Sequence, residues 1–175
     1  MNHNFHIDYA NVALRPLSID DIEKLRIWRN DTNNSKYLSK NPYITPKMQD
    51  RWFKEYLFNE DEVCFAIVEK CNLNRLVGSL SLYDFEDKTC FFGKILIGDP
   101  EAHGRKVGLN ASKAAIQIAH EQLYIREIKL LVFPENIAAC KIYKDAGFIL
   151  DNEHVTSEGK REYLMTICLE NQKNA

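Results

Sequence analysis

Apolar residues recur along the chain with two different periods, which separate the expected strands from the expected helices. Residues 12–19, VALRPLSI, begin with an apolar run that favours a short strand. Ser18 and Asp21, three residues apart, form a pattern typical of a helix start. The residues that follow at helical spacing, and that we expect to face inward, are Ile22, Leu25 and Trp28.

A second helix start stands at Thr45-Pro46, because proline fits the first position of a helix, where its missing N–H is not needed. The segment KMQDRWFKEYLF follows, and its apolar residues at helical spacing are Trp52, Phe53, Tyr56 and Leu57. The chain is therefore expected to begin with one strand and two helices.

Three apolar or alternating segments come next, over residues 64–70, 75–84 and 90–98. Polar, turn-like residues separate them at 72–74 and 86–88. Such short connections join antiparallel neighbours, so we expect an antiparallel meander.

The helical period returns over residues 106–123, where the apolar face is expected to consist of Leu109, Ser112, Ile116, Ala119 and Leu123. A buried strand at 127–133, a helix over 136–147 that ends at a glycine, and strands at 148–155 and 163–169 complete the chain. This mixed order predicts an α/β (α+β) layer fold with one central sheet.

Length and composition favour one domain in a reducing compartment. A chain of 175 residues is long enough to fold alone, so we expect a single domain over residues 1–175 with its core at about 12–169. The five cysteines are odd in number and lack metal-ligand spacing, which predicts free thiols, no metal site and a cytoplasmic location. The start MNHNFHIDYA lacks a signal-peptide pattern, so no membrane partner is expected. The net charge of −2 does not favour binding to a nucleic acid.

The stretch HGRKVGLNASKAAIQIAH, residues 103–120, places two of the seven glycines beside two basic residues at a helix start. Free N–H groups at a helix N-terminus bind anions, Gly104 and Gly108 leave room for one, and Arg105 and Lys106 add positive charge. The P-loop and dinucleotide-binding patterns are both absent. The loop predicts either an anion site or a glycine-containing turn with solvated basic residues.

The helix NIAACKIYKDAGF offers a second candidate surface. Asn136, Ala139, Tyr143 and Gly147 are spaced three, four and four residues apart, so they share one helical face. Taken singly, Asn136 is explained as a helix cap and Tyr143 as a packed aromatic residue. Together with the glycine-containing loop, they favour one ligand held between the two segments.

The pattern Arg105-x-x-Gly108-x-Asn110 resembles the cofactor loop of the GNAT superfamily of acetyl-CoA-dependent N-acetyltransferases, and NIAACKIYKDAGF resembles the helix that follows it there. The resemblance covers residues 12–169 and includes the order of elements. LRPLSIDDIEKLRIWRND and ILIGDPEAHGRKVGLNA are similar to the branch with the ribosomal-protein alanine, diamine and amino-sugar acetyltransferases. The resemblance implies a single mixed, mostly antiparallel sheet flanked by helices, with one splayed pair of parallel strands.

This resemblance also implies a binding site for acetyl-CoA as co-substrate. The main chain of Leu96 and Ile97, on the strand that splays from its parallel neighbour, would hold the pantetheine arm, with Asn136 and Tyr143 facing it from the other side. The backbone that would receive the pyrophosphate comprises Arg105, Lys106, Val107, Gly108, Leu109 and Asn110. The family usually has Gly or Ala at the last position, so the side chain of Asn110 would either crowd the phosphates or hydrogen-bond to them.

Acetyl transfer to an amine needs an acid for the departing thiolate, an oxyanion donor and a base. The resemblance implies Tyr143 as the acid, because a phenol stays protonated at neutral pH, and an N–H of Leu96 or Ile97 as the oxyanion donor. Many relatives carry an acidic residue where this chain has CFFG, so we predict Glu86, across the preceding turn, as the base. The alternatives are Asp84, His103 and a chain of water molecules.

Residues 28–38, WRNDTNNSKYL, stand where this branch shapes its acceptor pocket, so Arg29, Asn30 and Asp31 are predicted to contact the acceptor; solvated residues at a helix end are the alternative. Because WRND is similar to amino-sugar and ribosomal-protein members, we predict transfer to a small amine-bearing metabolite, such as a nucleotide-linked amino sugar. A protein N-terminal α-amine and a non-catalytic acyl-CoA-binding module are the alternatives. The resemblance is compatible with a homodimer.

Overall fold

Eight strands form one sheet in the order β1-β2-β3-β4-β5-β6-β8-β7, in a computed structural model that describes residues 2–36 and 42–169. The strands are β1 (Ile7–Tyr9), β2 (Val12–Pro16), β3 (Glu62–Glu69), β4 (Arg75–Glu86), β5 (Thr89–Ile97), β6 (Glu127–Val132), β7 (Ile149–Val155) and β8 (Arg161–Cys168). Every pair of neighbours is antiparallel except β5 and β6. The predicted mixed, mostly antiparallel sheet is confirmed, including the meander of β3, β4 and β5.

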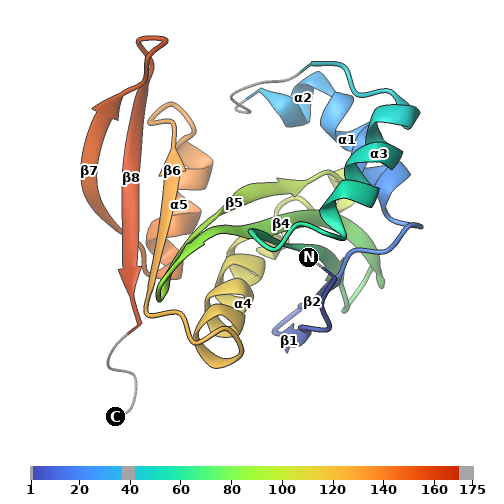
Figure 1. Ribbon diagram of the computed structural model, residues 1–175, viewed down its shortest axis with the longest axis horizontal. Helices are drawn as coiled ribbons and strands as arrows, with labels where there is room; N and C mark the ends of the chain where they lie inside the picture. Colours follow the sequence, from blue (N-terminus) through green and yellow to red (C-terminus); the bar gives the residue numbers. More distant parts are fainter. Residues whose placement is uncertain (1, 37–41, 170–175) are drawn as a thin grey trace.

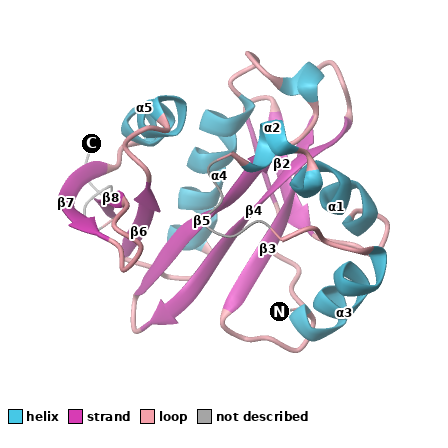
Figure 2. Cartoon of the chain, turned by 90° about the horizontal axis from the view of Figure 1, so that it is seen from above, coloured by secondary structure: helices cyan, strands magenta, loops and turns pink. Residues whose placement is uncertain are grey.

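Helices cover both faces of this sheet (Figure 1). They are α1 (Ile22–Asn30), α2 (Thr32–Ser35), α3 (Pro46–Tyr56), the 3-10 turn η1 (Pro100–Ala102), α4 (Val107–Glu121) and α5 (Ile137–Ala146). Helices α1 and α3 lie on one face of β3–β5 and α4 on the other, as the view from above shows (Figure 2). Within the described residues, no helix combines the length and apolar character needed to cross a membrane.

Local sequence signals set the helix ends largely as predicted. Thr45 caps α3 by accepting a hydrogen bond from the backbone N–H of Met48, and a proline occupies the first turn. Helix α5 ends at Gly147, whose φ of 109° needs a residue without a Cβ. Asp21 precedes α1, but its carboxylate accepts hydrogen bonds from the N–H and hydroxyl of Ser18 rather than from the helix.

Two hydrophobic clusters stabilise the sheet, one on each face. Helix α4 packs into the larger one with Val107, Ala111, Ser112, Ala114, Ala115, Ile118 and Ala119. The face predicted for this helix is wrong in part, since Leu109, Ile116 and Leu123 are only half-buried. The small alanine side chains let α4 lie close against the strands, with Val107 and Ile118 as the larger residues in the contact.

The remaining differences concern short elements. Periodicity does not predict β1, α2 or η1, because three or four residues are too few to show a period. Strand β2 opens the segment 12–19, as predicted, and ends at Pro16, since proline has no N–H to donate to a strand ladder.

Candidate active site

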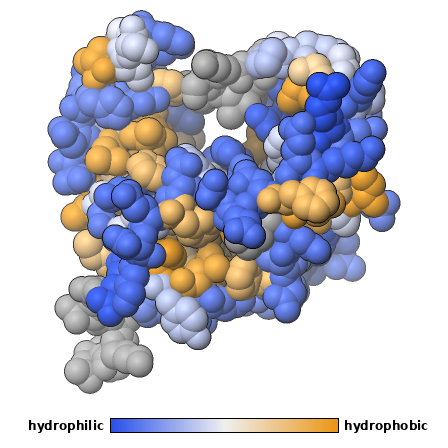
Figure 3. Space-filling view, viewed as in Figure 1, coloured by the Kyte–Doolittle hydropathy of each residue, from blue (hydrophilic) through white to orange (hydrophobic). Residues whose placement is uncertain are grey.

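A cleft opens where the parallel strands β5 and β6 separate. Their pairing covers only three positions, from Thr89 opposite Glu127 to Phe91 opposite Lys129, and β5 then continues beside β4 alone. The space between the strands, about 340 Å³, is called the strand cleft here, and its lining comprises Asn34, Tyr83, Lys94, Ile95, Leu131, Val132, Phe133, Asn136, Tyr143 and Glu162. The surface is hollowed in this region (Figure 3). The predicted splayed pair is therefore confirmed.

A bulge in β5 at Lys94, whose φ is 51°, is followed by a regular stretch that pairs with β4 through Leu96 and Ile97. The N–H of Gly98 donates to the carbonyl of Val77 on β4 at 2.9 Å. Because ladder bonds alternate along an antiparallel pair, the N–H and C=O of Ile97 face away from β4, and those of Leu96 face it. Of the two predicted main-chain contacts, the geometry favours Ile97.

The loop before α4 leaves backbone N–H groups available at the helix start. Gly104 and Lys106 have φ values of 75° and 58°, and Lys106 makes no side-chain cap hydrogen bond. The N–H of Asn110 donates to the carbonyl of Lys106 at 2.9 Å, as the first α-helical bond of α4. The N–H groups of the residues that precede Asn110 in the first turn of α4 have no helical carbonyl to bind. A left-handed turn followed by a helix N-terminus forms a concave site for anions.

The side-chain amide of Asn110 is held by Asn11 rather than placed over these N–H groups. Its Nδ2 donates to Oδ1 of Asn11 at 2.7 Å, and Asn11 donates to the carbonyl oxygen of Arg105 at 3.0 Å. Arg105 in turn donates from Nε to the carbonyl of Glu101 at 2.7 Å. These bonds tie the loop to the chain between β1 and β2, so Asn110 fixes the loop without filling it.

Helix α5 brings Asn136 and Tyr143 into the strand cleft, as their spacing predicts. Asn136 also caps the helix, since its Oδ1 accepts a hydrogen bond from the N–H of Ala139 at 3.2 Å. The ring of Tyr143 packs edge-on against Phe92, with ring centroids 5.8 Å apart. Burial raises the pKa of Tyr143 well above its ordinary value, so the hydroxyl stays protonated at neutral pH.

A second cavity of about 340 Å³, called the helix pocket here, lies between α1, α3 and the sheet. Its lining comprises Leu17, Leu25, Arg29, Ile44, Met48, Gln49, Trp52, Glu62, Cys64, Ser79, Leu80, Ser81, Lys94 and Leu96. Lys94 lines both cavities, so the helix pocket and the strand cleft meet at the bulge of β5.

Of the three residues predicted to contact the acceptor, the structure brings Arg29 to the helix pocket. Asn30 exchanges two hydrogen bonds of 2.8 Å with the main chain of Ile44 and so fixes the segment before α3. Asp31 caps α2 by accepting a hydrogen bond from the N–H of Asn33 at 2.9 Å. Asn30 and Asp31 therefore shape the helices around the pocket rather than line it.

The floor of the helix pocket holds a carboxylate that the sequence pattern does not identify. Glu62, at the start of β3, forms an ion pair with Nζ of Lys94 at 2.8 Å and accepts a hydrogen bond from the thiol of Cys64 at 3.3 Å. Burial alone would raise the pKa of Glu62, but the ion pair with Lys94 and hydrogen bonds from Ser81 and Cys64 outweigh it and hold this pKa below its ordinary value. The carboxylate is therefore ionised at neutral pH.

One sequence signal could have indicated this carboxylate. Glu62 and Cys64 are two residues apart at the start of a strand that is apolar over residues 65–68 and ends at Glu69, so both face the same side of the sheet. Their partner Lys94 reaches them only through the bulge in β5, which periodicity does not predict.

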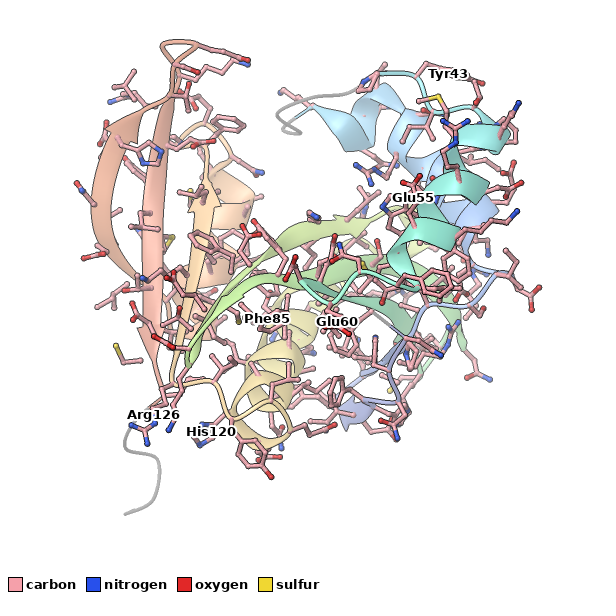
Figure 4. The ribbon with its side chains drawn as sticks, in the orientation of Figure 1. Tyr43, Glu55, Glu60, Phe85, His120 and Arg126 are labelled. Atoms are coloured by element: carbon pink, nitrogen blue, oxygen red, sulfur yellow. The ribbon has the colours of Figure 1, made fainter. Side chains whose placement is uncertain are left out.

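The predicted base, Glu86, lies at the other end of β5. It is exposed at the β4–β5 turn, opposite Thr89, where β5 and β6 are still paired. Figure 4 shows its neighbour Phe85 on the same side of the molecule as Arg126, whereas Tyr43 lies at the opposite end. Glu86 is therefore not among the residues that line either cavity.

The two side-chain alternatives for the base, Asp84 and His103, also lie outside the helix pocket. Asp84 is exposed near the end of β4. The Nε2 of His103 lies 3.0 Å from the carbonyl oxygen of Ile97, so the ring bonds to the main chain of β5. Neither side chain is part of the described lining of the helix pocket.

Known proteins that are similar to this chain in sequence are acetyltransferases. The family model of the acetyltransferase (GNAT) domain matches residues 11–149. The acetyltransferase PseH of Campylobacter jejuni is 26% identical over 78% of this chain and 82% of its own length. The spermidine N(1)-acetyltransferase of Escherichia coli is 24% identical over 82% of this chain and 75% of its own length.

Two solved structures resemble the whole fold. The spermidine N-acetyltransferase of Vibrio cholerae in complex with CoA and spermine matches with a TM-score of 0.82 at 20% identity, over 94% of this chain and 99% of that one. A GNAT family acetyltransferase of Bacillus anthracis matches with a TM-score of 0.80 at 16% identity, over 95% of this chain and 100% of that one.

Proposed function

Because the chain belongs to the GNAT acetyltransferase family, we propose that it transfers the acetyl group of acetyl-CoA to the primary amine of a small, anionic metabolite, such as a nucleotide-linked amino sugar. The chain is an N-acetyltransferase rather than a non-catalytic acyl-CoA-binding module. The proposed acceptor class rests on the residues that line the helix pocket.

Three features of the structure fit acetyl-CoA, which supplies the activated acetyl group when bound. The N–H groups at the start of α4 suit its diphosphate, with Arg105 and Lys106 beside them. The N–H of Ile97, which faces away from β4, suits a carbonyl of the pantetheine arm, whereas the C=O of Ile97 already bonds to the ring of His103. Tyr143 lines the strand cleft, and in the proposed reaction its hydroxyl donates a proton to the departing sulfur.

The charges in the helix pocket favour an acceptor with one amine and an anionic group. The charged residues of its described lining are Arg29, Glu62 and Lys94. Glu62 and Lys94 compensate each other, which leaves the guanidinium of Arg29 to bind a phosphate or carboxylate. A polyamine needs several carboxylates around it, and within the described lining Glu62 is the single acidic residue.

The acceptor class is tested by measuring CoA release with four amines. These are a nucleoside-diphosphate-linked amino sugar, glucosamine, spermidine and a peptide with an N-terminal alanine. We expect the highest kcat/KM for the sugar nucleotide. A higher value for spermidine, or for the peptide as in the N-terminal α-amine alternative, would contradict the proposed acceptor.

The role of Arg29 gives a second test of the same proposal. We expect Arg29→Gln to raise the KM of the sugar nucleotide about 10-fold or more, because a charge-assisted hydrogen bond is lost, and to leave the KM of glucosamine nearly unchanged. Arg51→Gln, which removes an exposed charge from α3, is the matched control. If both amines lose affinity equally, Arg29 does not bind an anionic group.

A further inference from the structure

The ion pair of Glu62 and Lys94, in which the carboxylate is buried and the lysine is exposed, lies where the helix pocket approaches the strand cleft. Glu62 lies on the floor of the helix pocket and faces Tyr83 across the β3–β4 pair. Lys94 lines both cavities, and its Nζ lies 4.8 Å from the centre of the Tyr83 ring, which lines the strand cleft. The carboxylate of Glu62, in the helix pocket, is therefore paired with the residue that lines both cavities.

Glu62 is also the group at this junction with the right protonation state. The titratable or charged groups around it are Lys94 on β5, Cys64 on β3, Tyr83 on β4, Tyr56 on α3 and Arg29 on α1. Burial raises the pKa of Cys64 to about 12 and also raises the pKa of Tyr83, so both stay protonated at neutral pH. Within the described lining of the helix pocket, Glu62 is the residue that can accept a proton there.

We propose that Glu62 takes the proton from the acceptor ammonium, directly or through one water molecule, and that Lys94 keeps the carboxylate ionised until the amine arrives. The proposal rests on the proposed acetyl transfer and assigns its base to Glu62 in place of Glu86. The neutral nitrogen then forms a bond to the acetyl carbon, and the carbon–sulfur bond breaks. The departing sulfur takes the proton of Tyr143. The acylated nitrogen then gives its extra proton to the phenolate of Tyr143, which restores the hydroxyl. Glu62 finally releases the proton that it took from the ammonium to solvent.

The ion pair explains how a carboxylate of low pKa can serve as this base. The side chain of Lys94 is 49% exposed, so an incoming ammonium can replace it beside Glu62, whose side chain is 11% exposed. The ammonium then takes over from Lys94 in lowering the pKa of Glu62, while burial opposes it by raising this pKa. Burial in the same pocket lowers the pKa of the ammonium, so the two values approach each other and the proton can transfer.

The first test is the pH profile of Glu62→Gln, measured with whichever primary amine the wild-type enzyme acetylates fastest. The amide keeps the size of the side chain and an oxygen that accepts from Cys64. We expect kcat/KM to fall about 100-fold at neutral pH and to recover as the pH approaches the pKa of the free amine, since solvent then supplies the neutral form. Glu60→Gln, at an exposed residue of the loop before β3 (Figure 4), is the matched control.

The second test uses Lys94→Met, which keeps the aliphatic stem and removes the charge. In the wild type, Lys94 holds the pKa of Glu62 low, so the carboxylate stays active until the pH falls through that low value. In Lys94→Met this pKa is higher, and we expect the acid limb of kcat/KM to move to higher pH. Thermal melting and acetyl-CoA affinity, measured on each variant, identify any loss that comes from misfolding.

Three results would overturn the assignment of Glu62. They are a loss in Glu62→Gln that is the same at every pH, an acid limb that does not move in Lys94→Met, and a pH-dependent loss produced by Glu86→Gln instead. The proposed acceptor class is judged on the wild-type enzyme alone, so its failure is distinguishable from the failure of the base.

Discussion

Tyr143 is buried against Phe92 and Phe148, with 6% of its surface exposed, and it lines the strand cleft. We expect Tyr143→Phe to lower kcat about 100-fold or more, because the variant cannot donate a proton to the departing sulfur. The affinity for acetyl-CoA should change little, since the ring packing is kept. Steady-state kinetics and calorimetric titration with CoA measure the two effects, and an unaltered kcat would leave Tyr143 as a packing residue.

Asn110 and Asn11 give a prediction about the cofactor loop. Each substitution to alanine should lower the free energy of unfolding by about 1 kcal/mol, and the double variant should lose less than the sum, because both changes remove the same 2.7 Å bond. Urea unfolding measures the coupling. A large loss of acetyl-CoA affinity in Asn110→Ala without loss of stability would show that the side chain bonds to the phosphates instead.

The candidate residues differ in how far the sequence predicts them. Asn136 and Tyr143 share a helical face, and helical spacing alone brings them to one side of one cleft. Glu62 has one partner nearby in sequence, Cys64, but its partners Ser81 and Lys94 come from two other strands, so local sequence shows only part of its surroundings. Glu86 is nearer than Glu62 to the segment CFFG along the chain. The β4–β5 turn, however, directs Glu86 to the end of β5 that is paired with β6.

Whole elements are predicted best where the signal is local. The proline and threonine at the start of α3 and the glycine after α5 act within one turn of the helix, and both boundaries are found. The buried face of α4 depends on what the helix packs against, and it consists mostly of alanines, with Val107, Ser112 and Ile118 among them. The bulge of β5 depends on β4 and is not visible in the sequence of β5 alone.

The contact between α1 and the end of β5 can be tested through Gly98. A Cβ at this position would lie 2.2 Å from ring atoms of Trp28, so no larger residue fits beneath that ring. Gly98→Ala should lower the free energy of unfolding by about 1–3 kcal/mol. In urea unfolding, Gly98→Ala combined with Trp28→Leu should lose less than the sum of the two single changes, and additive losses would show that the two residues do not restrict each other.

At the scale of the molecule, the sheet is divided functionally where β5 leaves β6. One part, with α1 and α3, carries the helix pocket, and the other, with α5, carries Tyr143, so the two sides of the proposed reaction come from different parts of one sheet (Figure 1). The homodimer stays a prediction that sedimentation equilibrium can test. The single domain over residues 1–175 also stays a prediction.

Ligand binding should stabilise the whole molecule. Acetyl-CoA at 100 times its Kd should add about 2.7 kcal/mol to the free energy of unfolding and raise the Tm by roughly 5–10 °C. Acetyl-pantetheine, which lacks the diphosphate, should raise the Tm much less at the same concentration. Equal shifts from the two compounds in a thermal melt would contradict the anion site at the start of α4.

The most direct test of the account is a crystal structure of the protein with CoA. We predict that the diphosphate contacts the backbone N–H groups of residues 104–110 and that the pantetheine arm lies between β5 and β6, with its sulfur beside Tyr143. A diphosphate bound elsewhere, or β5 and β6 paired along their full length with the arm outside them, would contradict it.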